Sequence, residues 1–312
     1  MRDNTNHSLS SRHLIGLQGV PEKDIQLILD TATTFREILE RPIKKVPTLK
    51  GKTIVNLFFE NSTRTRISFE LAQKRLSMDT VNFSTSTSST KKGETFKDTV
   101  KNIEAMKIDM IVVRHQSAGV PKYLTEISDA NIINAGDGRH EHPTQALLDM
   151  YSIREKLGKL KGLKVCIVGD VAHSRVSLSN IYGLQTMGAE VSLCGPATMM
   201  PKDVEKLGVK VFNNIDEAID YNDVLNVMRI QLEREAGNTI PSLREYNKYF
   251  GITRQRMEKH NKEILLLHPG PINRGVEMDP EICDGPNQII LPQVTNGVAV
   301  RMAILYLLGT KN

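Results

Sequence analysis

The sequence contains no tryptophan, and aromatic residues make up only 5% of its 312 residues. Proteins that hold single-stranded nucleic acids commonly stack the bases on several aromatic side chains, so this class is disfavoured. Only three cysteines are present, Cys166, Cys194 and Cys283, and they are far apart in the sequence. Such a small, odd and scattered set argues against a disulfide scaffold and a cysteine zinc site, and it fits a reducing compartment.

Long apolar runs are also missing. No uninterrupted run approaches the roughly 20 residues that a membrane span requires. The longest runs, Ile264–Leu267 and Ala303–Leu308, have the length of core segments. The N-terminal residues are polar and lack the apolar stretch of a secretory signal. We therefore expect no membrane partner and a cytoplasmic location.

The charges are nearly balanced. Lysine and arginine number 41 and aspartate and glutamate 36, which gives a formal net charge of +5. This modest excess is compatible with nucleic acid, an acidic surface or anionic small molecules as the partner. The length favours two domains, each large enough to bury a core.

Short apolar runs rich in valine and isoleucine alternate with helical stretches. Because these runs show little apolar–polar alternation, they predict buried parallel strands. The expected strands form two batches, Thr53–Phe59, Thr80–Phe83, Met110–Arg114 and Asn131–Asn134, then Lys164–Val168, Glu190–Leu193, Lys210–Phe212, Asp223–Met228 and Glu263–Leu267. The helices expected between them include Glu22–Leu39, Arg66–Met78, Thr95–Met106, Thr144–Leu157 and Val176–Met187, with a last helix at about Val298–Leu308.

This pattern predicts an α/β protein of two domains, each a parallel β-sheet flanked by helices, joined by interdomain helices. The seam is expected near Leu157–Gly162, where a long helix ends and a new strand follows. We expect a first domain at residues 1–150 and a second at residues 151–293. The C-terminal helix, within residues 294–312, is expected to pack on the first domain.

The segment Ser62–Arg66 (STRTR) combines three hydroxyls and two arginines just after an expected strand. Free backbone N–H groups and the helix dipole favour an anion at a helix N-terminus, and an arginine suits phosphate. An ordinary helix cap needs a single hydroxyl. The composition of this segment therefore predicts an anion site.

Three further segments contain candidate polar residues. Lys91 and Lys92 lie in a glycine-containing polar loop, and Arg114 ends an expected strand, where α/β sheets bind their ligands. In the segment 136–149, His140 and His142 are spaced like a metal pair, but further ligands are not evident. We interpret His142 instead as a donor to a substrate carbonyl oxygen and Gln145 as a partner for an amide.

The strands expected in the second domain are also followed by polar and cationic residues. Arg175 follows one strand, Arg229 and Gln231 follow a second, and the segment 268–271 (HPGP) follows a third. Strand carboxyl ends meet at one edge of a parallel sheet, so these residues are expected to face one crevice. Two arginines at such positions suit a ligand with two carboxylates.

Taken together, these motifs resemble the catalytic chains of the aspartate and ornithine carbamoyltransferase family. The resemblance rests, in the order of the family, on STRTR at 62–66, KKGET at 91–95, VVRH at 112–115, HPTQALLD at 142–149, MRIQ at 228–231 and HPGPINRG at 268–275. KKGET and HPGP favour the aspartate branch, because the HCLP motif of the ornithine branch is absent from the sequence.

The resemblance implies an enzyme, a carbamoyltransferase that joins carbamoyl phosphate to L-aspartate and releases N-carbamoyl-L-aspartate and phosphate, early in pyrimidine synthesis. It also implies a homotrimer whose active sites lie between neighbouring chains, no cofactor and no metal. Partner proteins remain open, and a regulatory chain or a dihydroorotase is compatible with the family.

The resemblance also implies roles for individual residues. Arg64, Thr65, Arg114 and His142 would act on the reacting groups, with Thr65, Arg114 and His142 directed at the carbonyl oxygen. The residues implied to bind carbamoyl phosphate are Ser62, Thr63, Arg64, Thr65, Ser88, Lys92, Arg114, His142, Gln145, Gly270 and Pro271. Those implied to bind aspartate are Lys92, Arg175, Arg229 and Gln231. In the family, Ser88 and Lys92 come from the adjacent chain, and the Gly270–Pro271 bond is expected to be cis.

One position departs from part of the family. Gly270 stands where some members have leucine, which removes a side chain but keeps the main-chain carbonyl. Three alternatives stay open at this point: a carbamoyltransferase for ornithine or an ornithine derivative, a nucleic-acid-binding protein, and a metal hydrolase. Arg229 argues against the first, because a cationic substrate would require an acidic pocket.

Overall fold

The computed structural model describes residues 8–60, 62–84, 95–231 and 240–310. The chain divides into two compact units, residues 1–148 with 295–312, and residues 149–294. The unit boundaries fall inside helices α5 (Pro143–Leu157) and α11 (Ile290–Gly309), so both helices run from one unit into the other. The predicted fold class, two parallel sheets flanked by helices and joined by helices, is confirmed.

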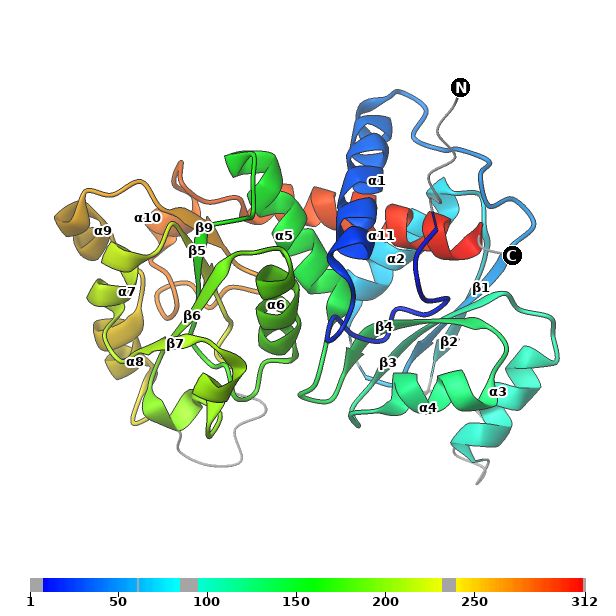
Figure 1. Ribbon diagram of the computed structural model, residues 1–312, viewed down its shortest axis with the longest axis horizontal. Coiled ribbons are helices and arrows are strands. Elements are labelled where there is room, and N and C mark those ends of the chain that lie inside the picture. Colours follow the sequence, from blue (N-terminus) through cyan, green and yellow to red (C-terminus); the bar gives the residue numbers. More distant parts are fainter. Residues whose placement is uncertain (1–7, 61, 85–94, 232–239, 311–312) are drawn as a thin grey trace. The chain divides into compact units, whose positions relative to one another are not determined.

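The first unit is built on a parallel sheet with the strand order β2-β1-β3-β4. Figure 1 shows α3 and α4 on one face of this sheet and α1, α2 and α11 on the other. Besides α5 and α11, the elements are α1 (Glu22–Glu40), β1 (Thr53–Phe58), α2 (Thr63–Arg75), β2 (Asp79–Ser84), α3 (Phe96–Glu104), β3 (Met110–His115), α4 (Val120–Ile127) and β4 (Asn131–Asp137).

The core of the first unit follows the two-residue period of its strands. Val55 and Leu57 of β1 and Ile111 and Val113 of β3 point to one face of the sheet, where they pack with Val100 of α3. Intervening residues of the same strands are buried on the opposite face. Because both faces of these strands are buried, their sequences are nearly continuous apolar runs.

The second unit has a five-stranded parallel sheet with the order β7-β6-β5-β8-β9. Figure 1 shows α6 on one side of this sheet and α7, α8 and α9 on the other. Its elements are β5 (Lys164–Val168), α6 (Arg175–Thr186), β6 (Glu190–Cys194), the 3-10 helices η3 (Ala197–Met199) and η4 (Val204–Leu207), β7 (Lys210–Phe212), α7 (Ile215–Tyr221), β8 (Val224–Val227), α8 (Leu243–Phe250), α9 (Arg254–His260), β9 (Leu265–Leu267) and α10 (Pro280–Cys283).

The last helix differs from the prediction. It was expected from about Val298, after Pro292, but α11 begins at Ile290 and includes Pro292 in its first turn. A proline is tolerated there because the first N–H groups of a helix have no intrahelical partner. By length and composition alone α11 is suited to cross a membrane, although no single apolar run is that long. Of the most apolar 18-residue stretch of α11, 67% is buried within the protein, as in the core helix of a globular domain.

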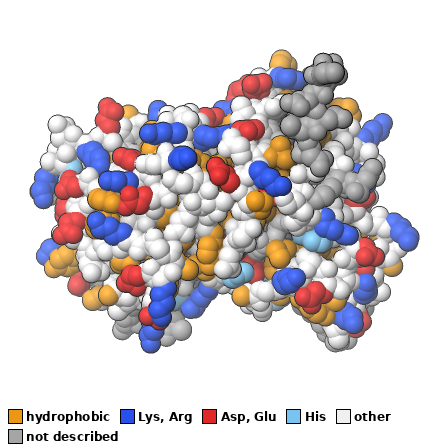
Figure 2. All heavy atoms as spheres, viewed as in Figure 1, with side chains coloured by type: hydrophobic (Ala, Val, Ile, Leu, Met, Phe, Trp, Pro, Cys, Tyr) orange, Lys and Arg blue, Asp and Glu red, His pale blue; other side chains and the backbone are white. Residues whose placement is uncertain are grey.

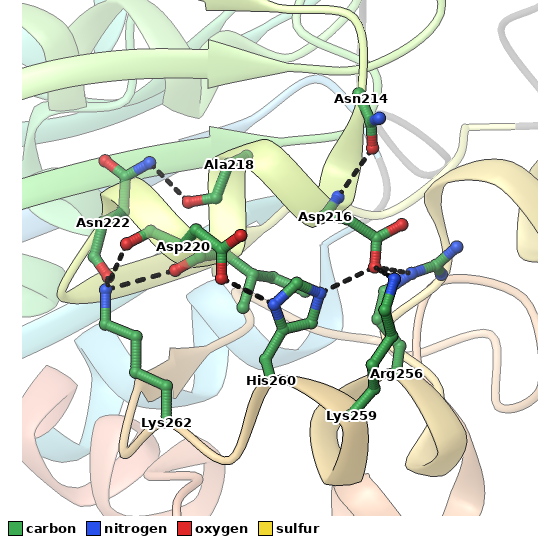
Figure 3. Close-up of polar contacts among 10 residues, drawn as sticks. Asn214, Asp216, Ala218, Asp220, Asn222, Arg256, Lys259, His260 and Lys262 are labelled. Atoms are coloured by element: carbon green, nitrogen blue, oxygen red, sulfur yellow. Dashed lines mark hydrogen bonds and ion pairs between the residues drawn. The ribbon is translucent and has the colours of Figure 1, made fainter.

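A cluster of polar side chains joins α7 to α9 (Figure 3). His260 Nε2 lies 2.7 Å from Asp216 Oδ1, and His260 Nδ1 lies 2.6 Å from Asp220 Oδ1. Since both ring nitrogens face carboxylates, the imidazole is satisfied only when doubly protonated. The hydrogen bond to Asp216 accordingly raises the pKa of His260. Arg256 Nε lies 3.3 Å from Asp216, and Lys262 Nζ donates to the carbonyl of Asp220 at 2.9 Å.

Replacing His260 with alanine should lower the free energy of unfolding by about 1–2 kcal/mol at pH 6, since the carboxylates are partly exposed and screened by solvent. A pKa raised in the folded state stabilises the fold fully below the unfolded pKa and loses this effect as the pH rises through the folded pKa. The difference between wild type and H260A should therefore shrink from pH 6 to pH 9 in urea unfolding.

The matched control is Lys259→Ala, because Lys259 Nζ lies 3.8 Å from Asp216 and its side chain is 71% exposed. K259A should change stability by less than about 0.5 kcal/mol at either pH. A destabilisation of H260A that is constant across this pH range would contradict a role for the protonated imidazole.

Candidate functional site

The strand order of the first unit places the Ser62–Arg66 segment beside Arg114. The connection after β1 leads to β2 on one side, and the connection after β3 leads to β4 on the other, so the strand order reverses between β1 and β3. Phe59 N donates to Arg114 O at 2.9 Å across this pair of strand ends. Open α/β sheets bind ligands at the carboxyl ends of strands where the order reverses.

The start of α2 differs from that of an ordinary capped helix. The helix begins at Thr63, three residues before the predicted Arg66, and Ser62 is its N-cap residue. The Ser62 side chain makes no capping hydrogen bond, whereas Thr95 and Ser174 cap α3 and α6. The first turn of α2 also has no acidic residue. The positive end of the helix dipole is therefore not offset locally, and this favours an anion.

Arg114 is held in place by two neighbouring segments. Its Nε lies 2.6 Å from Glu60 Oε1, and its Nη1 donates to Ala135 O of β4 at 3.0 Å. The Arg114 side chain is 11% exposed and that of Glu60 is 13% exposed. These contacts orient the guanidinium at the end of β3, beside the loop after β1. Glu60 was missed in the sequence, because its pairing depends on the register of β1 and β3.

His142 is positioned by a tight turn after β4. It precedes Pro143, the first residue of α5, and its carbonyl accepts from Gln145 N at 3.0 Å. Asp137, at the end of β4, holds this turn. One of its oxygens accepts from Glu141 N at 3.2 Å, and the other accepts from Gly119 N at 2.8 Å. Asp137 is thus a supporting residue that was not selected from the sequence.

The metal interpretation of the 140–142 segment receives no support from the side-chain positions. His140 Nδ1 lies 3.1 Å from Asp137 Oδ2. Glu141 is buried and its Oε2 accepts from Leu17 N at 2.7 Å, so it fastens the N-terminal segment. Within the described residues, no group of three or more His, Cys, Asp or Glu side chains is arranged to hold a metal ion.

The second unit has the same kind of reversal between β5 and β8. The connection after β5 leads to β6, and the connection after β8 leads to β9 on the opposite side. Met228 N donates to Val168 O at 2.7 Å, so the two strand ends lie together. Gly169 has a φ of +114°, and a Cβ there would lie 3.0 Å from Met228 O. Glycine therefore permits this close approach.

Arg175 and Arg229 follow the two strands that flank this reversal. Arg175 is buried and is the first residue of α6, after the N-cap Ser174. Ser174 Oγ lies 3.5 Å from Met228 Sδ, directly before Arg229 in the chain. Local contacts thus bring the two arginine-bearing segments together. Gln231 is half-buried and follows Arg229 by two residues.

A buried carboxylate, Glu277, fixes the backbone that follows Arg229. Glu277 Oε1 accepts from Ile230 N at 2.8 Å, and its Oε2 accepts from Asn273 N at 2.7 Å. Asn273 Nδ2 donates to Glu277 Oε1 at 2.7 Å and to Ile230 O at 3.2 Å. Burial raises the pKa of Glu277. This residue joins the Arg229 segment to the segment after β9, and nothing in the sequence pattern singled it out.

Replacing Glu277 with glutamine should weaken binding of a dicarboxylate ligand at Arg229 by about tenfold. Both carboxylate oxygens of Glu277 accept from backbone N–H groups, and the glutamine NH₂ group would place a donor against one of them. The shift is measured as the apparent affinity for a dicarboxylate ligand or as its KM. The control is Glu258→Gln, since Glu258 pairs with Arg254 on the surface of α9. An E277Q variant with wild-type affinity would exclude this positioning role.

The segment after β9 forms a compact turn. His268 Nδ1 accepts from Gly270 N at 2.8 Å. The Gly270–Pro271 peptide bond is cis, as predicted, and Gly270 has a φ of +63°. The hydrogen bond between Gly270 N and His268 Nδ1 holds the backbone of this turn next to β9. Two other predicted residues, Ser88 and Lys92, lie outside the described residues.

The surface charges do not form a continuous basic patch on the face drawn in Figure 2. Lysine and arginine side chains are interspersed there with aspartate and glutamate. A nucleic-acid-binding surface is expected to concentrate basic side chains on one face. The charge distribution on this face therefore gives no support to that alternative.

The sequence matches two family descriptions that together span nearly its whole length. Residues 12–155 match "Aspartate/ornithine carbamoyltransferase, carbamoyl-P binding domain", and residues 161–308 match "Aspartate/ornithine carbamoyltransferase, Asp/Orn binding domain". The chain is 61% identical over 301 residues to the aspartate carbamoyltransferase catalytic subunit of Cytophaga hutchinsonii, covering 96% of this chain and 98% of the relative. It is 59% identical to the subunit of the same description from Gemmatimonas aurantiaca, covering 96% and 93%.

Solved structures show the same similarity. Aspartate transcarbamoylase from Trypanosoma cruzi, solved with carbamoyl phosphate and aspartate, has a TM-score of 0.85 at 29% identity and covers 94% of this chain and 95% of its own. The complex of that enzyme with carbamoyl aspartate and phosphate has a TM-score of 0.86 at 29% identity, with the same coverage. The catalytic subunit of aspartate transcarbamoylase from M. jannaschii has a TM-score of 0.82 at 37% identity and covers 96% and 98%.

Proposed function

The chain belongs to the aspartate/ornithine carbamoyltransferase family, and from this premise we propose how its residues bind and activate two substrates. The relatives named above are aspartate carbamoyltransferase catalytic subunits and match over nearly full length. The chain is a transferase that moves the carbamoyl group of carbamoyl phosphate to the amine of L-aspartate. The products are N-carbamoyl-L-aspartate and phosphate.

The phosphate of carbamoyl phosphate binds at the N-terminus of α2. Ser62, Thr63 and Thr65 offer hydroxyls and backbone N–H groups there, and Arg64 adds a guanidinium. Two features support this assignment. The side chain of the N-cap residue Ser62 makes no capping hydrogen bond, and the first turn has no acidic residue. Arg114 completes the site because the contact with Glu60 directs it to the neighbouring strand end.

The carbonyl oxygen of the substrate gains negative charge as the aspartate amine attacks. Thr65, Arg114 and His142 donate hydrogen bonds to this oxygen. Donors that are oriented before the reaction stabilise the developing charge more than flexible ones, and such stabilisation is usually the largest catalytic contribution. The contacts of Arg114 with Glu60 and Ala135 and the turn that holds His142 support this orientation.

The carbamoyl NH₂ group requires acceptors. Gln145 in the first turn of α5 and the main-chain carbonyls of Gly270 and Pro271 serve this purpose. The turn closed by His268 Nδ1 and Gly270 N supports the assignment, because it fixes the direction of these carbonyls. The glycine at position 270 leaves the carbonyl function unchanged.

The two carboxylates of aspartate bind to Arg175 and Arg229, with Gln231 as a further donor. The position of both arginines after strands that flank the β5–β8 reversal supports this pair. A guanidinium donates two parallel hydrogen bonds to one carboxylate, so two arginines select a dicarboxylate over a cationic amino acid. Ser88 and Lys92 of an adjacent chain complete the site, both for carbamoyl phosphate and Lys92 also for aspartate.

Carbamoyl transfer proceeds by direct attack of the amine, and the departing phosphate accepts the proton. Catalysis then comes from positioning and electrostatics. The three cysteines are buried, and burial raises the pKa of Cys166 to about 12, so its thiol is not a ready nucleophile. No cofactor or metal is required by this route.

The working form is a homotrimer whose neighbouring chains share active sites. Ile67 and Leu71, one turn apart on α2, are 48% and 40% exposed. Neighbouring exposed apolar side chains of this kind support a protein contact. β2 ends at Ser84, shortly before Ser88 and Lys92 in the sequence. Sedimentation should give about three times the chain mass of 34.9 kDa, and a monomeric mass would contradict the trimer.

The cellular setting follows from the reaction. Carbamoyl aspartate formation serves pyrimidine synthesis, and we place the enzyme in the cytoplasm because its three cysteines are free thiols. Neither nucleic acid nor a membrane is needed as a partner. A regulatory chain or a dihydroorotase is compatible with the trimer, and co-purification would detect such a partner.

The observation on which this function chiefly rests is that each unit places arginines at a strand reversal, Arg64 and Arg114 in the first unit and Arg175 and Arg229 in the second. The test is product identification. Purified protein incubated with carbamoyl phosphate and L-aspartate should yield N-carbamoyl-L-aspartate, identified by mass spectrometry, in equal amount to the phosphate released. Phosphate release that does not depend on aspartate would refute transfer.

A further inference from the structure

One buried carboxylate in the second unit contacts three elements that lead to separate parts of the proposed site. Asp149 of α5 is fully buried. Its Oδ2 accepts from Asn180 Nδ2 at 3.0 Å and from Asn226 Nδ2 at 3.2 Å. Its Oδ1 accepts from Gln293 Nε2 at 2.9 Å. The three donors are carboxamides from α6, β8 and α11.

Two of these carboxamides lie close in sequence to the arginines of the aspartate site. Asn180 belongs to α6, the helix that begins at Arg175, and its side chain also donates to Val176 O at 3.2 Å. Asn226 lies in β8, three residues before Arg229. A carboxylate bonded to both side chains fixes α6 relative to β8 and thereby the spacing of the two arginines.

The third carboxamide extends the network to the turn after β9. Gln293 Oε1 accepts from His268 N at 3.0 Å, while its Nε2 donates to Asp149. His268 opens the turn that contains Gly270 and Pro271. The amide of Gln293 is therefore oriented from both ends, because the carboxylate can only accept and the backbone N–H can only donate.

We propose that Asp149 is a positioning residue for carbamoyl transfer, which sets the register of the Arg175, Arg229 and Gly270–Pro271 segments through the three carboxamides. This inference rests on the proposed function of those segments. Asp149 touches no substrate and acts through Asn180, Asn226 and Gln293. Charged acceptors make stronger hydrogen bonds than neutral ones, which suits a residue that must hold three elements at once.

Asparagine at position 149 retains the shape of the side chain but replaces one acceptor oxygen with a donor NH₂ group. Its amide N–H would face a donor, unless Gln293 turned its oxygen toward residue 149 and gave up His268 N. The single variant D149N therefore disturbs the turn after β9 or loses a bond to one carboxamide. We expect the KM for aspartate to rise about tenfold or more, with kcat reduced, since about 1.4 kcal/mol of binding corresponds to tenfold.

A second substitution restores the pattern. In D149N/Q293E, one oxygen of the carboxylate introduced at position 293 accepts from His268 N, and its other oxygen accepts from the amide introduced at position 149. The oxygen of that amide still accepts from Asn180 and Asn226. The negative charge moves from one side chain to its hydrogen-bond partner, and the volume is unchanged. We expect the double variant to return the KM for aspartate to within about threefold of wild type, as expected for coupled neighbours.

The matched control is Asp223→Asn. Asp223 Oδ2 accepts from Lys164 N at 2.9 Å before the start of β8, at the amino ends of the strands. D223N changes another hydrogen-bonded carboxylate of the same unit, away from the three segments. We expect its melting temperature to fall while its KM for aspartate stays within about twofold of wild type, because only stability is affected.

The experiment measures kcat, the KM of both substrates and the melting temperature for wild type, D149N, Q293E, D149N/Q293E and D223N. Carbamoyl-aspartate formation by the wild type tests the proposed function separately. The inference is overturned if D149N keeps a wild-type KM for aspartate, or if the double variant is no closer to wild type than D149N. Should D149N fail to fold, a folded double variant with near-native kinetics supports the inference, and a defective double variant overturns it.

Discussion

Replacing Arg64 with alanine is expected to lower kcat/KM for carbamoyl phosphate by about 100-fold or more, since charge-assisted hydrogen bonds to a phosphate are worth about 1.5–3 kcal/mol each. Arg64 is the second residue of α2, at the end where the helix dipole is positive. The first turn of α2 contains no acidic residue, so the positive end of its dipole is not offset there. The loss should be measured by steady-state kinetics at varied carbamoyl phosphate.

The same motif provides the control for this variant. Arg66 Nε lies 3.6 Å from Glu70 Oε1 one turn further along α2, and its side chain is 47% exposed. Arg66→Ala in the same assay should therefore change kcat/KM by less than about threefold, as expected for an exposed pair. Equal losses in R64A and R66A would indicate a general disturbance of α2 and would contradict a specific phosphate contact. Melting temperatures identify such a disturbance.

Replacing Arg229 with alanine is expected to raise the KM for aspartate by about 100-fold while the KM for carbamoyl phosphate stays nearly unchanged. Arg229 follows a strand at the strand reversal of the second unit. The next residue is held in place because Ile230 N donates to Glu277 Oε1 at 2.8 Å. Loss of the cation leaves one carboxylate of aspartate unpaired. The measurement is the aspartate saturation curve at saturating carbamoyl phosphate.

Arg244→Ala is the control, because Arg244 is exposed on α8 in the same unit. It should leave both KM values within about twofold of wild type. An R229A enzyme with normal aspartate kinetics would remove the dicarboxylate clamp from the mechanism. A parallel rise in both KM values would point to misfolding of the unit in place of a lost contact.

Most of the fold was predictable from the sequence because its strands are buried on both faces. The run Lys164–Val168 is apolar after its first residue, and its observed bounds equal the predicted ones. The start of α11 was not predictable in the same way. Pro292 reads as a helix boundary, but it stands in the first turn, where a missing N–H has no consequence. Short helices such as α7 and α9 offered too few turns for a periodic signal.

The site was predictable where one segment contains several functional groups. The five residues Ser62–Arg66 contain three hydroxyls and two arginines, whereas an ordinary helix cap needs a single hydroxyl. Supporting residues lack such a signal because their partners are remote in sequence. Glu277 contacts Ile230 across 47 residues, and Gln293 contacts Asp149 across 144 residues. Their roles depend on tertiary contacts, which a single sequence does not display.

This chain should transfer a carbamoyl group to aspartate and not to ornithine. The direct test compares kcat/KM for the two amino acids in one preparation at saturating carbamoyl phosphate. Two arginines at the second site should favour the dicarboxylate by about 1,000-fold or more, because the cationic side chain of ornithine would face two like charges. A rate with ornithine equal to or above that with aspartate would contradict the claim.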